Sequence, residues 1–134
     1  MRNLNLFTLV ILGSFVLMVS CRSAKVGRAG EDFSNFYQRF LTDSAFQMKR
    51  VQFPLSGKLI TAEIQDSTYQ WTPDTWVMLQ EFDLDPVFYE RNLQVTDTLA
   101  TDEIYTPNTG FYFKMVFEPA KRKWYLVYLV DQNL

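Results

Sequence analysis

The sequence predicts an α+β fold in which N-terminal helices pack on a curved antiparallel sheet. The chain has 134 residues, of which 48% are apolar and 16% aromatic, enough for one domain with a single core. Helical periodicity is strongest just after residue 31, whereas alternation typical of strands dominates the C-terminal third. Helices that precede the strands, rather than alternate with them, favour the α+β class.

Residues 1–20 predict a signal peptide that is removed from the mature protein. Arg2 is the only charge before an apolar run at residues 6–19, and Cys21 follows directly after a serine. An apolar core of this length after a positive end is typical of secretory signals and is shorter than the roughly 20 residues that span a bilayer. An uncleaved membrane anchor is the alternative, because no charge occurs between Arg2 and Arg22.

Met18-Val19-Ser20-Cys21 resembles a bacterial lipobox, in which the cysteine receives a lipid and becomes the mature N-terminus. Methionine stands where leucine is usual. The resemblance implies a protein of the cell envelope that is anchored to a bacterial membrane through Cys21 and faces the periplasm. The alternatives are a chemically inert cysteine and a cysteine that ends a conventional secretory signal. Residues 21–31, with two glycines and few large apolar side chains, predict a flexible tether to a single domain at residues 32–134.

Two helices are expected at the start of this domain. Asp32 is a suitable N-cap, and Ser44 with Gln47 forms a capping-box pattern that predicts a second helix at residues 45–50. The first helix carries one apolar stripe, which consists of Phe33, Phe36, Tyr37, Phe40 and Leu41.

Strands are predicted to follow. Residues 51–55 alternate apolar and polar side chains, and Pro54 confines this strand to a sheet edge or a strand end. A turn at Ser56-Gly57 separates it from a second strand at residues 58–64, and a further turn is expected at Asp66-Ser67.

Thr72-Pro73-Asp74 predicts the start of a third, short helix, because a capping residue precedes a proline and an acid. Trp76, Leu79 and Phe82 would face the core from this helix.

The remaining chain ends in a predicted hairpin. Residues 83–95 are ambiguous between a helical turn and a strand, and residues 96–109, which include Asp102, predict a solvated loop rich in threonine and aspartate. Residues 111–117 and 124–130 predict two strands that are apolar enough to be covered on both faces. Their core-facing residues are expected to be Phe111, Phe113, Met115 and Phe117 on one strand and Trp124, Leu126, Tyr128 and Val130 on the other.

Several segments of the domain resemble a family of small lipoproteins of unknown function from Gram-negative gut bacteria, over about residues 32–131. The segments are Phe36-Tyr-Gln-Arg-Phe40, Asp43-Ser-Ala-Phe-Gln47, Arg50-Val-Gln-Phe-Pro-Leu55-Ser-Gly57 and Lys123-Trp-Tyr-Leu126. That family is similar to the nuclear transport factor 2-like (cystatin-like) superfamily. The resemblance implies a cone-shaped roll of helices on a curved sheet, with a cavity at one end, and no established activity.

Composition excludes several classes of chemistry. The chain has no histidine, one cysteine and a formal net charge of −2, which removes histidine-dependent triads, cysteine metal clusters and a basic nucleic-acid surface. The alternating acids Glu81, Asp83 and Asp85 lack the rest of a calcium loop. We expect no metal, cofactor or nucleic acid, and any acid–base chemistry must use carboxylates and tyrosines.

The function predicted from the sequence is a non-catalytic domain that binds a small apolar or amphipathic ligand or a partner. One alternative is a proton-transfer enzyme with a pocket carboxylate and a tyrosine, and another is a homodimer formed through the sheet face. Aromatic side chains with polar tips suit amphipathic ligands. The candidate pocket residues are Tyr37, Tyr69, Trp71, Trp76, Phe113 and Trp124.

Radiolabelled palmitate tests the lipid anchor. We expect the label to enter the full-length protein in a Gram-negative host and to be absent from Cys21→Ser. Equal incorporation into both chains would contradict lipidation at this residue.

Overall fold

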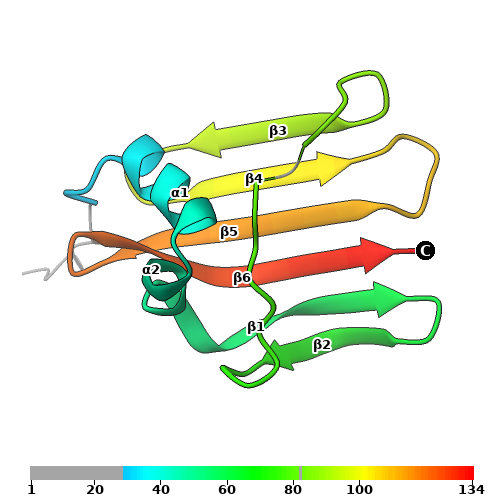
Figure 1. Cartoon of the computed structure of the whole chain (residues 1–134), viewed down its shortest axis with the longest axis horizontal. Helices are drawn as coiled ribbons and strands as arrows, with labels where there is room; N and C mark the ends of the chain where they lie inside the picture. The colour runs from blue at the N-terminus through cyan, green and yellow to red at the C-terminus, as the bar shows by residue number, and fades with distance from the viewer. Residues whose placement is uncertain (1–28, 82) are drawn as a thin grey trace, which may run out of the picture.

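The computed structural model describes residues 29–81 and 83–134, so the predicted signal peptide and Cys21 lie outside the described residues. Two helices come first and are followed by six strands in one sheet (Figure 1). The elements are α1 (Phe33–Thr42), α2 (Ser44–Met48), β1 (Val51–Thr61), β2 (Gln65–Trp71), β3 (Glu90–Val95), β4 (Ala100–Tyr105), β5 (Tyr112–Ala120) and β6 (Lys123–Asn133).

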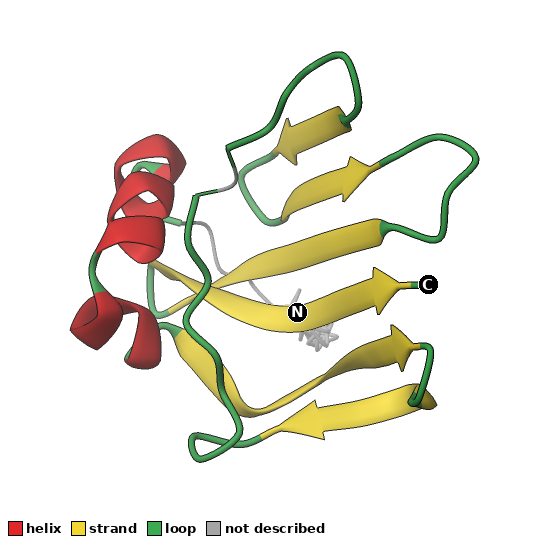
Figure 2. Cartoon of the chain, turned by 45° about the vertical axis from the view of Figure 1, so that its right-hand side comes forward, coloured by secondary structure: helices red, strands yellow, loops and turns green. Residues whose placement is uncertain are grey.

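The predicted α+β class is confirmed, with one correction to the sheet. The strand order is β2-β1-β6-β5-β4-β3. Neighbouring strands run antiparallel except β1 and β6, which pair in parallel, so the sheet is mixed. Both helices and the connection from β2 to β3 lie on one face of the sheet (Figures 1 and 2). No helix within the described ranges is long and apolar enough to cross a membrane.

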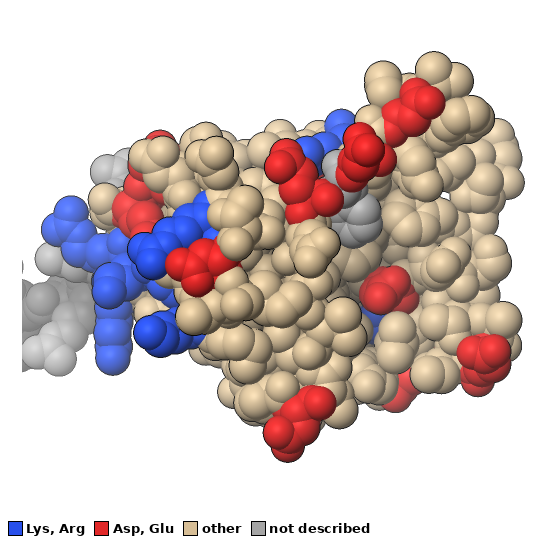
Figure 3. Space-filling view, in the orientation of Figure 1, with Lys and Arg blue, Asp and Glu red and all other residues tan. Residues whose placement is uncertain are grey.

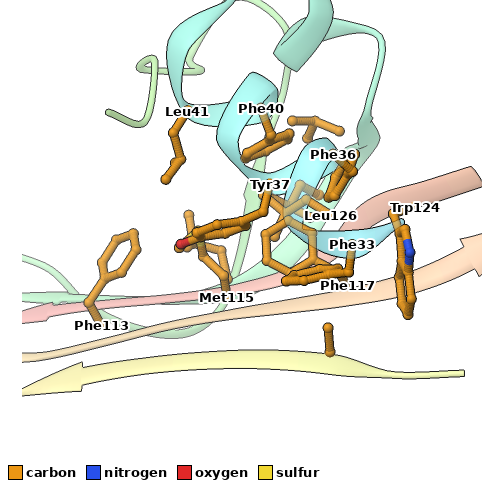
Figure 4. Packing of buried hydrophobic residues seen from close by; sticks show 14 of the residues in the cluster. Phe33, Phe36, Tyr37, Phe40, Leu41, Phe113, Met115, Phe117, Trp124 and Leu126 are labelled. Carbon is orange, nitrogen blue, oxygen red and sulfur yellow. The ribbon is translucent and has the colours of Figure 1, made fainter. Parts of the chain in front are cut away.

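The aromatic stripe of α1 is buried as predicted, and it packs on β5 (Figure 4). Asp32 caps the helix by accepting a hydrogen bond from the Asn35 amide at 2.9 Å. The Phe117 ring of β5 meets four rings of α1 edge to face, at centroid distances of 5.4–5.7 Å. Edge-to-face contacts of this kind add to the hydrophobic gain from burial and fix the helix on the sheet.

The second helix is shorter than predicted and has a different cap. The Asp43 carboxylate, rather than the Ser44 hydroxyl, accepts the Phe46 amide at 2.9 Å. The expected capping box fails because the Gln47 side chain turns into the core, where it is fully buried.

β1 is one continuous strand, so the predicted turn at Ser56-Gly57 is wrong. Pro54 lies inside this strand, which has neighbours on both sides, and not at an edge. The pairing of β1 with β6 lapses between Val51 and Ser56, so the missing amide hydrogen of Pro54 removes no hydrogen bond from this ladder. The turn predicted at Asp66-Ser67 is also wrong, because both residues belong to β2.

The segment from Thr72 to Tyr89, which we call the crossing segment, replaces the predicted third helix. It begins with a turn, in which the Thr75 amide donates to the Thr72 carbonyl at 3.1 Å, and then runs across the face of the sheet (Figure 2). A second turn lies near its end, where the Phe88 amide donates to the Asp85 carbonyl at 3.0 Å. Trp76 and Leu79 pack against the core as expected, but from a backbone that is neither helix nor strand. Phe82 lies outside the described residues.

Two further corrections concern the C-terminal half. The predicted loop at residues 96–109 contains β4, and its Asp102 is fully buried. Val116 of β5 pairs with Tyr128 of β6, whereas the next residue of β5, Phe117, pairs with Leu126. β6 therefore contains one extra residue, which shifts the register. Leu129 therefore joins the core in place of Tyr128.

The other face of the sheet carries polar and aromatic side chains. Lys114 forms a salt bridge with Glu103 at 2.7 Å, and the Tyr112 hydroxyl donates to the same carboxylate at 3.1 Å. Burial, together with that carboxylate, raises the pKa of Tyr112 to about 12. The predicted homodimer through this face stays a prediction.

Gly57 allows the close approach of β1 to β6. A Cβ atom at this position would lie 1.8 Å from the Leu129 carbonyl oxygen and 2.7 Å from the Trp71 ring. We expect Gly57→Ala to lower the free energy of unfolding by about 3 kcal/mol or more, because backbone must move to admit the methyl group. Urea unfolding followed by tryptophan fluorescence measures the loss. The neighbouring exposed Ser56→Ala is the control, and equal stability of the two variants would contradict the packing.

Candidate functional site

The most deeply buried charge lies where α1 meets β3 and β4. The Asp102 carboxylate is fully buried and accepts hydrogen bonds from Nε and Nη2 of Arg91, both at 2.9 Å. The Tyr37 hydroxyl donates to the same carboxylate at 2.5 Å. Burial, with Asp102 beside it, raises the pKa of Tyr37, so the hydroxyl stays protonated. Both carboxylate oxygens therefore have strong donors, and the group acts as an anchor between helix and sheet.

A second feature is an open cleft between the crossing segment and strands β1, β2 and β6. Its volume is about 280 Å³. The lining residues, which we call the aromatic cleft, are Leu59, Tyr69, Trp71, Thr75, Trp76, Val77, Leu79, Leu129 and Asp131. Three of the six predicted pocket residues, namely Tyr69, Trp71 and Trp76, meet here. The Tyr69 and Trp71 rings lie 4.8 Å apart and are inclined by 70°, which makes one aromatic corner of the cleft.

Gln47 positions the wall of the aromatic cleft that the crossing segment supplies. Its Nε2 donates to the carbonyl oxygens of Phe40 at 2.7 Å and Leu79 at 2.9 Å. Its Oε1 accepts from the Leu79 amide at 2.9 Å and from the Trp76 indole at 3.1 Å. One buried amide thus satisfies four polar groups and replaces the backbone hydrogen bonds that a helix would give Leu79.

Among the described residues that line the cleft, Asp131 is the only one with a charged side chain. It lies on β6 opposite Phe113 of β5, and no hydrogen bond or salt bridge of its carboxylate occurs within the described ranges. Burial raises the pKa of this carboxyl. Sequence reasoning missed Asp131 because the predicted apolar strand ends at residue 130. No local sequence signal could have found it, because the register shift in β6 that turns this aspartate toward the core face depends on pairing with β5.

The other three predicted pocket residues lie elsewhere. Tyr37 belongs to the Asp102 network and borders a polar groove of about 310 Å³ beside Arg91. Phe113 and Trp124 are core residues with 5% and 2% exposure and do not line the aromatic cleft. The Trp124 indole donates to the Glu31 carbonyl at 3.0 Å.

Arg50 is a structural residue that joins the start of the domain to β6. Its guanidinium binds both carboxylate oxygens of Glu31, at 2.8 and 2.9 Å, and the Trp124 carbonyl at 3.0 Å. Residues 29–31 were assigned to the tether, but they lie against the domain. The Ala29 amide donates to the Asp97 carbonyl and the Gly30 amide to the Arg122 carbonyl.

Within the described part of the chain, no group of three or more acidic or cysteine side chains is arranged to hold a metal ion.

Comparison with known proteins places this geometry in a family. A protein-family model matches residues 31–132, which is more than half of the chain. No curated protein matches the chain.

Solved structures share the fold. A cystatin-like protein from Bacteroides caccae has a TM-score of 0.58 and 22% identity, over 78% of this chain and 80% of that one. A protein from Bacteroides uniformis has a TM-score of 0.56 and 23% identity, over 78% and 79%. A nuclear transport factor 2-like protein from Bacteroides fragilis has a TM-score of 0.52 and 20% identity, over 78% and 48%. At these identities the likeness concerns the fold.

Replacing Gln47 should release the wall of the aromatic cleft. Gln47→Leu keeps the volume but leaves three backbone groups and the Trp76 indole without partners, so we expect a loss of about 2–4 kcal/mol in the free energy of unfolding. Hydrogen exchange of the Leu79 amide should also become faster. Gln38→Leu, on the exposed side of α1, is the matched control. Unchanged stability in Gln47→Leu would show that the amide does not hold the crossing segment.

Removing the Asp131 charge should stabilise the ligand-free protein. Because burial raises the pKa of this carboxyl, the folded state holds its proton more tightly than the unfolded state does. The contribution of the Asp131 carboxyl to the free energy of unfolding is therefore greatest below pH 3.8, the ordinary pKa of aspartate. It falls as the pH rises through the raised pKa of the folded state. We expect Asp131→Asn to exceed the wild type in stability at pH 7 and to match it at acidic pH, as measured by urea unfolding. The exposed Glu118→Gln is the control, and a destabilised Asp131→Asn at pH 7 would contradict the assignment.

Proposed function

The chain belongs to the family whose model matches residues 31–132, a family with the cystatin-like and nuclear transport factor 2-like fold, and we propose that its domain binds a small amphipathic ligand in the aromatic cleft. The observation that carries the proposal is the open cleft itself, with apolar and aromatic walls and one carboxylate. Its volume of about 280 Å³ is near the lower end of the range for ligand pockets, roughly 300 Å³ and above. Such a cleft suits a small ligand with one polar group.

We further propose that the domain is anchored to a bacterial membrane through Cys21 and faces the periplasm. Seven residues lie between Cys21 and Ala29, where the chain meets the domain, so eight Cα-to-Cα steps join the two. A fully extended segment of that length reaches at most about 29 Å, so the cleft would work close to a membrane surface. A ligand released from or carried near the membrane fits this position.

Proton transfer is a second candidate function, favoured by the raised pKa of Asp131 in apolar surroundings. The interior tyrosine–carboxylate pair, Tyr37 with Asp102, is unsuited to this chemistry because Arg91 occupies both carboxylate oxygens. Binding without catalysis is therefore the function that the geometry supports best.

Native mass spectrometry of the full-length protein, purified from its host in mild detergent, tests the proposal. We expect a small molecule to co-purify with the wild type and to be lost from Val77→Trp, which fills the cleft from an exposed position. Val87→Trp, equally exposed on the crossing segment but outside the cleft lining, is the matched control and should keep the ligand. A ligand-free wild-type monomer, or equal retention by both variants, would contradict the proposal. A ligand-free dimer would favour the homodimer alternative.

A further inference from the structure

Asp131 differs from three other carboxylates that lie in or beside the core. Asp102 is clamped by Arg91, Glu31 by Arg50, and Glu103 by Lys114. Each of these pairs compensates the loss of hydration of its carboxylate. Among the residues that the structure describes, Asp131 has no such cation, and those that line the cleft around it include neither lysine nor arginine. The described cleft residues therefore leave the charge of this partly buried carboxylate without a compensating cation.

The cleft also favours a positive over a negative or neutral ligand group. An anion would be repelled by Asp131, and a neutral apolar ligand would bury the carboxylate further without a partner, which costs free energy. A cation would form a charge-assisted hydrogen bond in surroundings where water screens it weakly.

The aromatic walls have the same preference. Aromatic ring faces carry negative partial charge and attract cations, with tryptophan the strongest. Tyr69 and Trp71 form a corner of two inclined rings, and Trp76 stands on the crossing segment. The Trp76 indole N–H is already bound to Gln47, so its ring contributes surface and not a donor. Figure 3 shows that the visible face beside the crossing segment is mostly uncharged, with scattered acidic side chains.

From this combination we infer that the ligand of the aromatic cleft is an organic ammonium ion with an apolar body, bound through the Asp131 carboxylate. The inference rests on the proposed function and specifies its ligand class. The ammonium group lies at the β6 side of the cleft against Asp131. The apolar body packs in the corner of Tyr69 and Trp71, beneath Trp76.

Fluorine NMR of the full-length protein in nanodiscs of zwitterionic lipid tests the inference. The chain has three tryptophans, so 5-fluorotryptophan gives three resonances that single substitutions assign. The probes are phenethylamine, which is cationic at neutral pH, and 2-phenylethanol, its neutral counterpart. Phenethylamine should shift the resonances of Trp71 and Trp76. Trp124, which lies in the core away from the cleft, is the internal control.

Charge-neutralising variants give the decisive comparison. We expect Asp131→Asn to weaken phenethylamine binding by roughly tenfold or more, as for the loss of one charge-assisted hydrogen bond. The same variant should bind 2-phenylethanol at least as well as the wild type does, because a neutral ligand no longer buries an unpaired charge. Glu118→Gln removes the same charge from an exposed position and should bind as the wild type does.

The outcomes separate the inference from the proposed function. Equal affinity for the two probes, or equal phenethylamine affinity in Asp131→Asn and the wild type, overturns the inference while ligand binding in the cleft stands. Shifts of Trp124 alone place the probe elsewhere and overturn the inference. Binding of neither probe overturns the inference, and a ligand-free wild type in native mass spectrometry would then remove the proposed function as well.

Discussion

The side-chain amide of Gln47 is the interaction on which the shape of the candidate site depends. It lies in the core between α1 and the crossing segment and bonds to Phe40, Trp76 and Leu79. Without these bonds, the irregular backbone around Leu79 would have unsatisfied polar groups inside the protein, at roughly 1–3 kcal/mol for each group. The amide therefore lets the chain cross the sheet without forming a helix. An aromatic wall stands over β1, β2 and β6 as a result.

Two aspartates on the same face of the sheet show how surroundings divide roles between identical groups. Asp102 has Arg91 and Tyr37 on its oxygens, so its charge is neutralised and its position fixed. Asp131 faces an open space lined by apolar and aromatic groups, and burial raises its pKa. The first arrangement stabilises the fold, and the second is costly to the free protein. A cost of this kind is common at binding sites, where stability is traded for function.

The sequence predicted the elements whose signal is local. The stripe of α1 and the C-terminal hairpin follow from helical and strand periodicity, and both are present. The crossing segment was mispredicted because Thr72-Pro73-Asp74 favours a helix locally, whereas Gln47, over thirty residues away, satisfies Leu79 in another conformation. β4 was mispredicted because a buried aspartate looks like a loop residue until its arginine is known.

The candidate site was only partly predictable for a similar reason. An aromatic side chain has the same sequence pattern whether it faces a void or fills the core, so Tyr69, Trp71 and Trp76 could not be separated from Phe113 and Trp124. The role of Asp131 could be recognised only from the register of β6, which depends on pairing with β5.

The most direct measurement is a crystal structure of the protein, free and soaked with phenethylamine. It should show an open cleft with Trp76 bonded to Gln47, and the ammonium group within hydrogen-bonding distance of Asp131. A cleft closed by the crossing segment, or a probe bound away from Asp131, would contradict the central claim.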